Sequence, residues 1–155
     1  MRKLTVIIAL LLMSAVLSAA IISDQDISAE KLASLISRYY PDTYAIDEST
    51  VIIDPEWTAL TLYLDKDYRT ILLSCYWLLD ESITPEEIMT AANEWNKGNM
   101  IPTAYYDGSD HSLTADYAMT WAEDGIPSGM FIEVVRWMDE ATILLGAYLS
   151  DCGLV

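Results

Sequence analysis

The chain has 155 residues, with 24 acidic against 8 basic side chains, a formal net charge of −16 and an isoelectric point near 4.1. This length fits one domain, and a hydrophobic content of 53% with a mean hydropathy of +0.24 excludes a disordered acidic tail. The excess of negative charge also excludes nucleic acid and anionic membrane surfaces as partners, because both attract clustered Lys and Arg.

The first twenty residues have the layout of a secretory signal peptide. The chain begins with two basic residues, at positions 2 and 3. An apolar stretch at 4–17, with two polar side chains, and three small residues at 18–20 follow. This order predicts cleavage after Ala20 and a periplasmic or secreted protein. The alternative is an uncleaved anchor extending to Ile22, but three polar residues interrupt the run of about 20 apolar residues that a membrane span needs.

Cleavage would leave residues 21–155 as a single domain. It removes Arg2 and Lys3 and no acidic residue, so the net charge deepens from −16 to −18. A chain of this size buries about two-thirds of its unfolded surface, which suffices for one core without cross-links. Two cysteines remain, Cys75 and Cys152, and the sequence leaves open whether they form a disulfide or stay as free thiols.

The first expected element is a helix between Ser28 and Pro41, followed by extended segments. Ser28 is a suitable N-cap, and apolar side chains recur at helical spacing at Leu32, Leu35, Ile36 and Tyr39. Residues rich in β-branched and aromatic side chains then predict strands at 51–53, 59–64 and 70–79, with a turn at 65–67.

Residues 84–98 carry the clearest helix signal. Thr84 can cap the helix, Pro85 suits the first helical position, Glu87 completes a capping box, and Gly98 ends the helix. The apolar face that this helix would bury consists of Ile88, Ala91, Ala92 and Trp95.

A hairpin is expected next, with arms at 102–106 and 113–121 and a turn at 107–110. The second arm alternates: Leu113, Ala115, Tyr117, Met119 and Trp121 face one way, whereas Ser112, Thr114, Asp116 and Thr120 face the other. One solvated face is typical of an antiparallel sheet that helices cover on the opposite side.

A long final helix is expected from Ser128, as its N-cap, to about Leu149. Its buried stripe would be Phe131, Val134, Val135, Met138 and Leu145. The full order α-β-β-β-α-β-β-α predicts an α+β domain in which helices pack on an antiparallel sheet of about five strands.

The chain resembles the YbjN-domain family, also known as a bacterial sensory transduction regulator family. The similarity lies in Asn-Glu-Trp-Asn at 93–96, the strands at 101–106 and 113–121, and the segment from Gly125 into residues 131–137. The resemblance implies a fold similar to that of type III secretion chaperones. It also implies a non-catalytic role toward a protein or peptide partner, with a homodimer as a second expectation.

Five residues are candidates for a binding surface: Asn93, Trp95, Asn96, Trp121 and Trp137. Tryptophans and amides of this kind can form a ligand-binding face or an aromatic cage. The alternative is structural, because Trp95 lies on the apolar stripe of its helix and Asn96 lies where a side chain can satisfy terminal carbonyls.

The hairpin turn offers the other candidate, a cation site formed by Asp107, Asp110 and His111. The alternative is an ordinary Asp-Gly turn with a positive φ at Gly108, which we favour because the spacing matches no calcium loop.

No catalytic, metal-binding or cofactor-binding motif is present in the sequence. We therefore expect no enzymatic activity, no cofactor, and a secreted or periplasmic domain that binds a protein or peptide. The alternatives are a small-molecule or cation-binding module that uses aromatic residues and carboxylates, and a carboxylate-based hydrolase.

Overall fold

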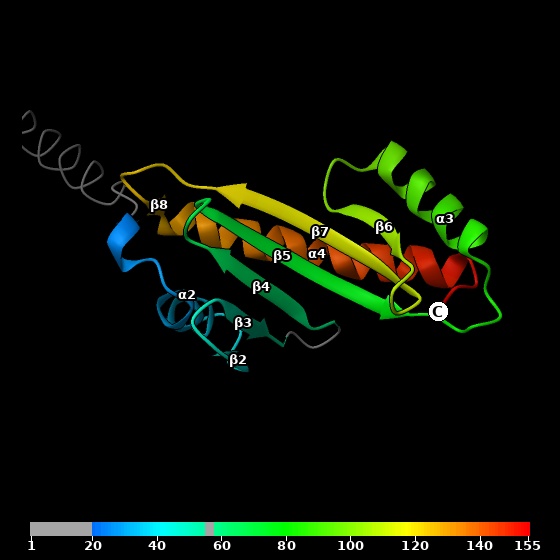
Figure 1. Cartoon of the computed structure of the whole chain (residues 1–155), viewed down its shortest axis with the longest axis horizontal. Helices are drawn as coiled ribbons and strands as arrows, with labels where there is room; N and C mark the ends of the chain where they lie inside the picture. Colours follow the sequence, from blue (N-terminus) through cyan, green and yellow to red (C-terminus); the bar gives the residue numbers. More distant parts are fainter. Residues whose placement is uncertain (1–19, 55–57) are drawn as a thin grey trace, which may run out of the picture.

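The computed structural model describes residues 20–54 and 58–155 (Figure 1). Residues 1–19, which make up almost all of the predicted signal peptide, lie outside the described residues, so signal cleavage stays a prediction. Within the described residues, no helix is long and apolar enough to cross a membrane.

The described residues form eight strands, three α-helices and one short 3-10 helix. In chain order these are β1 (Ile21–Ile22), η1 (Asp24–Asp26), α2 (Ala29–Ile36), β2 (Thr43–Ala45), β3 (Thr50–Ile53), β4 (Leu60–Asp65), β5 (Thr70–Leu78), α3 (Pro85–Gly98), β6 (Thr103–Asp107), β7 (Ser112–Thr120), β8 (Ile126–Pro127) and α4 (Ser128–Asp151).

Six strands form one antiparallel sheet in the order β2-β3-β4-β5-β7-β6, and β1 pairs with β8 in a separate two-stranded sheet. The α+β class and the predicted order of eight main elements are confirmed. The prediction of about five strands is corrected to six, because β2 was not expected. Strand β2 is only three residues long, which is too short to show a periodic pattern in the sequence. It is a strand because it pairs with β3.

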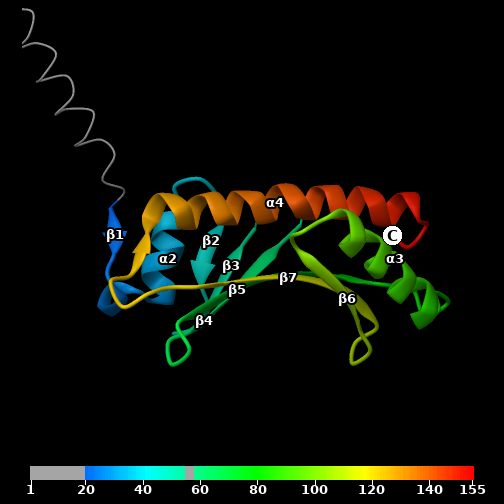
Figure 2. The ribbon, with the colours of Figure 1, turned by 90° about the horizontal axis from the view of Figure 1, so that it is seen from above.

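Helix α4 covers one face of the sheet. Figure 2 shows α4 running along the sheet, with α2 near one end of this helix and α3 near the other. The turns that join β4 to β5 and β6 to β7 project away from α4. The face of the sheet turned away from α4 therefore carries no helix among the described residues.

The core lies between α4 and the sheet face beneath it, which we call the covered face. Strand β5 alternates along its length, and it buries Leu73 and Cys75 on this face beside Leu113 and Ala115 of β7. The predicted stripe of α4 is confirmed, since all of its members are buried: Phe131, Val134, Val135, Met138 and Leu145.

Two predicted helix starts are confirmed by their caps. The Lys31 backbone N–H donates to Ser28 Oγ at 3.2 Å. At the start of α3, the Glu87 N–H donates to Thr84 Oγ1 at 3.3 Å and the Thr84 N–H donates to Glu87 Oε2 at 2.9 Å, which completes the predicted capping box.

Two predicted helix boundaries are wrong, the C-terminal end of α2 and the N-cap of α4. Helix α2 ends at Ile36 and does not reach Tyr39: residues 37–39 form a turn, in which the N–H groups of Tyr39 and Tyr40 both donate to the carbonyl of Ile36. Ser128 is the first residue of α4 and not its cap: Pro127 holds the N-cap position, and the Ser128 N–H donates to the carbonyl of Ala20 at 2.8 Å.

The β6–β7 hairpin forms as expected, with two differences. The positive φ lies at His111 (58°), whereas Gly108 is not among the described residues with positive φ. Ser112 and Thr114 point to the face turned away from α4 but are buried. Their side chains are small, and larger residues flank them across the strands, such as Leu78 opposite Ser112.

Gly125 lies in the turn between β7 and β8. Its φ is +104°, and a Cβ atom there would lie 1.9 Å from the carbonyl oxygen of Ile22. Only glycine can therefore occupy this position beside β1 without moving the backbone.

Both cysteines are free thiols. Cys75 is buried in β5 on the covered face, whereas Cys152 is exposed just after α4. Burial, together with the nearby negative charge of Asp116, raises the pKa of the Cys75 thiol to about 12. The structure thus favours the free-thiol alternative over a disulfide.

Candidate functional site

The candidate site is the sheet face that α4 leaves uncovered, which we call the open face. Because side chains alternate along a strand, the residues that point to this face follow from the register. On the four central strands and β6 they include Ile52, Thr61, Tyr63, Leu72, Ser74, Tyr76, Leu78, Thr103, Tyr105, Thr114, Asp116 and Ala118.

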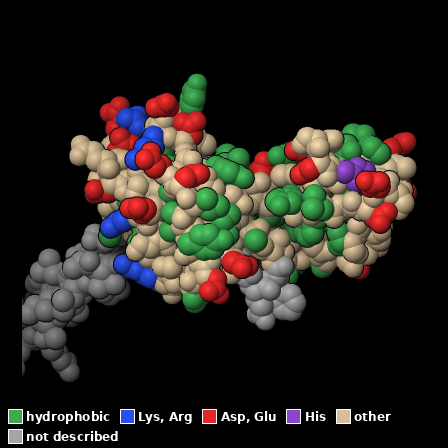
Figure 3. Space-filling view, turned by 60° about the horizontal axis from the view of Figure 1, so that its bottom comes forward, with side chains coloured by type: hydrophobic (Ala, Val, Ile, Leu, Met, Phe, Trp, Pro, Cys, Tyr) green, Lys and Arg blue, Asp and Glu red, His purple; other side chains and the backbone are tan. Residues whose placement is uncertain are grey.

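Large apolar and aromatic side chains are exposed on the open face. Tyr63, Tyr76, Leu78 and Tyr105 have exposed fractions between 41% and 66%. Figure 3 shows hydrophobic side chains gathered along the middle of the molecule, with acidic side chains around them and a hollow in the outline between the two ends. Several large exposed apolar side chains on one face are typical of an interaction site.

One depression lies on the open face near the β4–β5 turn. It has a volume of about 510 Å³, and Tyr63, Leu72, Tyr68 and Asp65 contribute to its lining. Tyr68 stands at the turn, where its N–H donates to Asp65 Oδ1 at 3.0 Å. The depression thus combines aromatic walls with a carboxylate at its rim.

Carboxylates also border the other end of the open face, at the β6–β7 turn. The backbone N–H and the hydroxyl of Ser109 donate to Asp107 Oδ1 at 2.9 and 2.7 Å. These bonds stabilise the ionised carboxylate and hold the pKa of Asp107 below its usual value. The rim of the open face is therefore negatively charged near neutral pH.

One carboxylate lies inside the open face. Asp116, in the middle of β7, accepts a hydrogen bond at Oδ2 from the Tyr105 hydroxyl at 2.7 Å. Its Oδ1 atom is buried and has no hydrogen-bond partner among the described residues. Burial and this carboxylate both raise the pKa of Tyr105, so the phenol stays protonated and acts as the donor.

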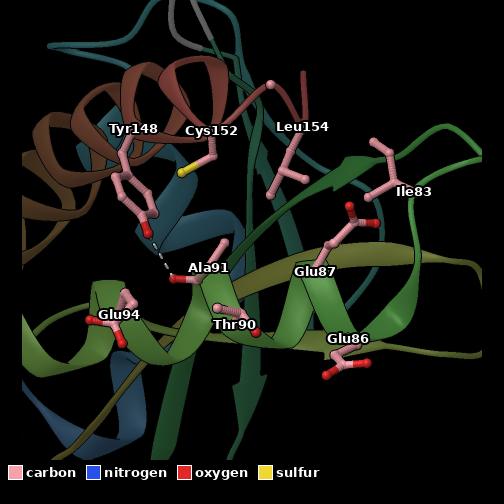
Figure 4. Close-up of a pocket in the computed structure, with 10 residues that line it drawn as sticks. Ile83, Glu86, Glu87, Thr90, Ala91, Glu94, Tyr148, Cys152 and Leu154 are labelled. Carbon is pink, nitrogen blue, oxygen red and sulfur yellow. Dashed lines mark hydrogen bonds between the residues drawn. The ribbon is translucent and has the colours of Figure 1, made fainter.

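A second concave feature lies between α3 and the C-terminal end of α4, away from the open face (Figure 4). It has a volume of about 510 Å³, a floor that includes Ala91, Tyr148 and Leu154, and glutamates along α3. The Tyr148 hydroxyl donates to the carbonyl of Ala91 at 3.3 Å and so joins the two helices. Cys152 also lines this groove.

The structure does not bring the five predicted binding residues together. Trp95 is buried and its Nε1–H donates to the carbonyl of Pro102 at 3.2 Å. The Asn96 amide donates to the carbonyl of Ala104 at 2.7 Å and accepts from the Ala104 N–H at 2.9 Å. Both residues therefore hold α3 against the β6 segment. Trp95 is a core residue, as the structural alternative expected, whereas Asn96 bonds to a strand and not to the terminal carbonyls of its own helix.

The other three candidates lie apart from these two or point to solvent. Asn93 is exposed on α3. Trp121 is buried after β7, where its Nε1–H donates to Asp24 Oδ1 at 2.6 Å. Trp137 is exposed on the outer side of α4. None of the five points to the open face.

The tyrosines of the open face were missed by the sequence reasoning. The usable signal is the alternation within β5, where Leu72, Ser74, Tyr76 and Leu78 all lie on one side. The segment was recognised as a strand, but only the position of α4 decides which of its two faces stays uncovered.

The residues described by the structure hold no grouping of three or more His, Cys, Asp or Glu side chains that suits a metal ion. At the β6–β7 turn, His111 Nδ1 lies 3.1 Å from the Tyr106 hydroxyl and Nε2 lies 3.1 Å from the carbonyl of Asp80. The carbonyl can only accept, so Nε2 is the donor to Asp80, and Nδ1 is paired with the Tyr106 hydroxyl. Both ring nitrogens are thus occupied by the fold.

The fold is shared with a solved structure. The crystal structure of YbjN from E. coli, described as "a putative transcription regulator", is 13% identical, covers 78% of this chain and 90% of that chain, and has a TM-score of 0.64. The HopA1–SchA chaperone–effector complex also matches, at 17% identity, with 70% of this chain and 88% of that chain covered and a TM-score of 0.49. No curated protein sequence matches the chain.

A family model matches most of the sequence. Residues 28–143 match the family YbjN, described as "Putative bacterial sensory transduction regulator". This range includes every strand of the six-stranded sheet and the first part of α4. Because the match spans well over half of the chain, the protein belongs to the YbjN family.

Proposed function

We propose that the protein is a non-catalytic binding domain that holds a segment of a partner protein across the open face of its sheet. The observation that carries the proposal is the exposed set of Tyr63, Tyr76, Leu78 and Tyr105 on a face that no described helix covers. A partner segment that covers these side chains gains the free energy of removing apolar surface from water, about 25 cal/mol per Å².

The charge of the protein selects the partner. With a net charge of −16 for the full chain, or −18 after cleavage at Ala20, and a carboxylate rim, the domain attracts a basic segment and repels acidic ones. A second copy of this chain is the competing occupant, but two such acidic surfaces repel each other. Light scattering distinguishes the two cases: a monomer in the absence of partner agrees with the proposal, and a dimer that hides the open face contradicts it.

A test needs a defined probe and a matched control. The protein, as purified from the cells that make it, is used to select binders from a peptide-display library, and the Kd of the best peptide is measured. Leu78→Ser changes the open face, whereas Leu144→Ser changes the outer side of α4 at nearly equal exposure, 66% against 63%. We expect at least about tenfold weaker binding for Leu78→Ser alone. Equal binding by both variants would contradict the use of the open face.

The proposed location is the periplasm or the exterior of the cell. It is supported by the cationic start, apolar stretch and small residues of positions 1–20. We expect N-terminal sequencing of the protein from the periplasmic or culture fraction to begin at Ile21. A protein that begins at Met1 and sediments with membranes would instead indicate the uncleaved anchor.

A second candidate function is the binding of a small organic cation in the groove between α3 and α4. The observation in its favour is an apolar floor with Tyr148 at one side and Glu86, Glu87 and Glu94 along the other. A saturable rise in Tm with spermidine that is reduced in Glu86→Gln would support this function. No shift up to millimolar spermidine would reject it.

A further inference from the structure

Among the residues that the structure describes, Asp116 is the one carboxylate in the interior of the open face. Its neighbours across the strands are Ser74 on β5 and Thr103 on β6, both uncharged. The other acidic positions on this face, Asp65 and Asp107, stand at strand ends beside turns. The sequence thus places a single negative charge in an otherwise neutral, aromatic surface.

This charge is incompletely compensated. The Tyr105 hydroxyl is the donor to Oδ2, and Oδ1 is buried without a donor from the described residues. The ion pairs between described residues are made by Arg69, Lys97 and Arg136, and they use other carboxylates. A partly buried carboxylate with one neutral donor is costly, and a second, charged donor would relieve that cost.

Two aromatic rings border the same position. Tyr76 lies opposite Thr114 on β5 and Tyr105 lies opposite Thr114 on β6, so both are diagonal neighbours of Asp116 on the open face. Both tyrosine residues are more than 40% exposed. A cation that approaches Asp116 between these rings gains cation–π attraction in addition to the charge pair.

We propose that Asp116 binds one basic side chain, Arg or Lys, of the partner segment at the centre of the open face. This inference rests on the proposed function. The cation competes with the Tyr105 hydroxyl for Oδ2, the oxygen on the exposed side of the carboxylate, while the apolar side chains on either side of it cover Tyr76 and Leu78. Asp116 thereby fixes the register of the segment, and the tyrosines supply contact area.

The test uses peptides selected from a display library on the wild-type protein. We expect the selected peptides to share one basic position among apolar or aromatic residues. For the best peptide, replacing that basic residue by Gln should raise the Kd about tenfold or more with wild-type protein, and should change it less than about threefold with Asp116→Asn. Asp107→Asn, which alters a rim carboxylate, should retain the full wild-type effect.

Tyr105→Phe tests whether the Tyr105 hydroxyl and the basic residue of the peptide compete for Asp116. It removes the hydroxyl that competes for Asp116 and keeps the ring, so we expect the basic peptide to bind as tightly as to wild type or more tightly. Asp116→Asn can still accept from Tyr105, and its unfolding curve checks that the fold is intact.

The outcomes distinguish the two proposals. Selected peptides that need Leu78 but show no common basic position, or that respond equally to Gln substitution in wild type and Asp116→Asn, would overturn the role of Asp116 and leave the open face as a binding surface. A library that yields no peptide dependent on Leu78 would overturn the proposed function and this inference with it.

Discussion

The two faces of the sheet are built from the same strands but have opposite properties. On β5, Leu73 and Cys75 point to the covered face and are buried, whereas Tyr76 and Leu78 point to the open face and are exposed. The covered face is sealed by α4 and accounts for stability. The open face contributes little to that core yet keeps aromatic side chains in water. The contrast separates residues that hold the fold from residues available to a partner.

Thiol reactivity should give the largest difference between the core and the molecular surface. We expect a thiol reagent at pH 8 to modify Cys152 at least about a thousandfold faster than Cys75, because Cys75 is buried with a pKa near 12 against an ordinary value of about 8.5. Mass spectrometry after a time course measures both rates. Two fast thiols would show that α4 does not seal the covered face, and no reactive thiol would indicate a disulfide.

Neighbouring leucines on β5 provide the next test. Leu73→Ala removes a fully buried side chain from the covered face, and we expect a loss of about 3 kcal/mol in the free energy of unfolding. Leu72→Ala, one residue away on the open face, should cost less than about 1 kcal/mol. Urea unfolding curves measure both. Similar losses would mean that the two faces are equally important for stability.

The attachment of α3 beside the sheet should have an intermediate effect. Asn96→Ala removes two hydrogen bonds to the backbone of Ala104, and we expect a loss of about 2 kcal/mol. The matched control is Asn93→Ala on the exposed side of the same helix, expected to stay within about 0.5 kcal/mol of wild type. If Asn93→Ala were the more damaging of the two, Asn93 would have a role that the fold does not reveal.

The smallest effect is expected from acid. Donation from Trp121, together with the charge of Arg69, holds the pKa of Asp24 below its usual value. A carboxylate with a lowered folded-state pKa contributes stability above its unfolded pKa, near 4, and loses it as the pH falls through the folded value. We therefore expect Asp24→Asn to flatten the decline in Tm below pH 4 relative to wild type.

The control for that profile is Glu48→Gln, which removes an exposed carboxylate that makes no hydrogen bond to the described residues. It should leave the slope of Tm below pH 4 unchanged. A slope that is identical in wild type and Asp24→Asn would show that the Asp24 contacts do not contribute to acid sensitivity.

Local signals in the sequence predicted local structure well. The Thr84–Glu87 capping box and the Ser28 cap are contained within four residues, so the sequence alone reveals them. The strands β1, β2 and β8 escaped because each is two or three residues long and exists only through a distant partner. Propensity cannot signal an element that short.

The site was harder to predict than the fold. Trp121 looked available for binding, but its indole N–H is bonded to Asp24, 97 residues earlier in the chain. The tyrosines of the open face looked like any strand residues, because which face α4 covers depends on packing over the whole domain. The role of Asn96 was closer to what its position near a helix end suggested, although its partner is a strand and not its own helix.

The two hydrogen bonds from Asn96 to Ala104 have a consequence for self-association. Strand β6 is the last strand of the sheet, and the Asn96 amide occupies an N–H and a C=O group that another chain would otherwise use to add a strand. The strand at the opposite edge, β2, is only three residues long. Neither border therefore offers a long template for β-sheet polymerisation, so the protein can expose an aromatic surface without growing into aggregates along its margins.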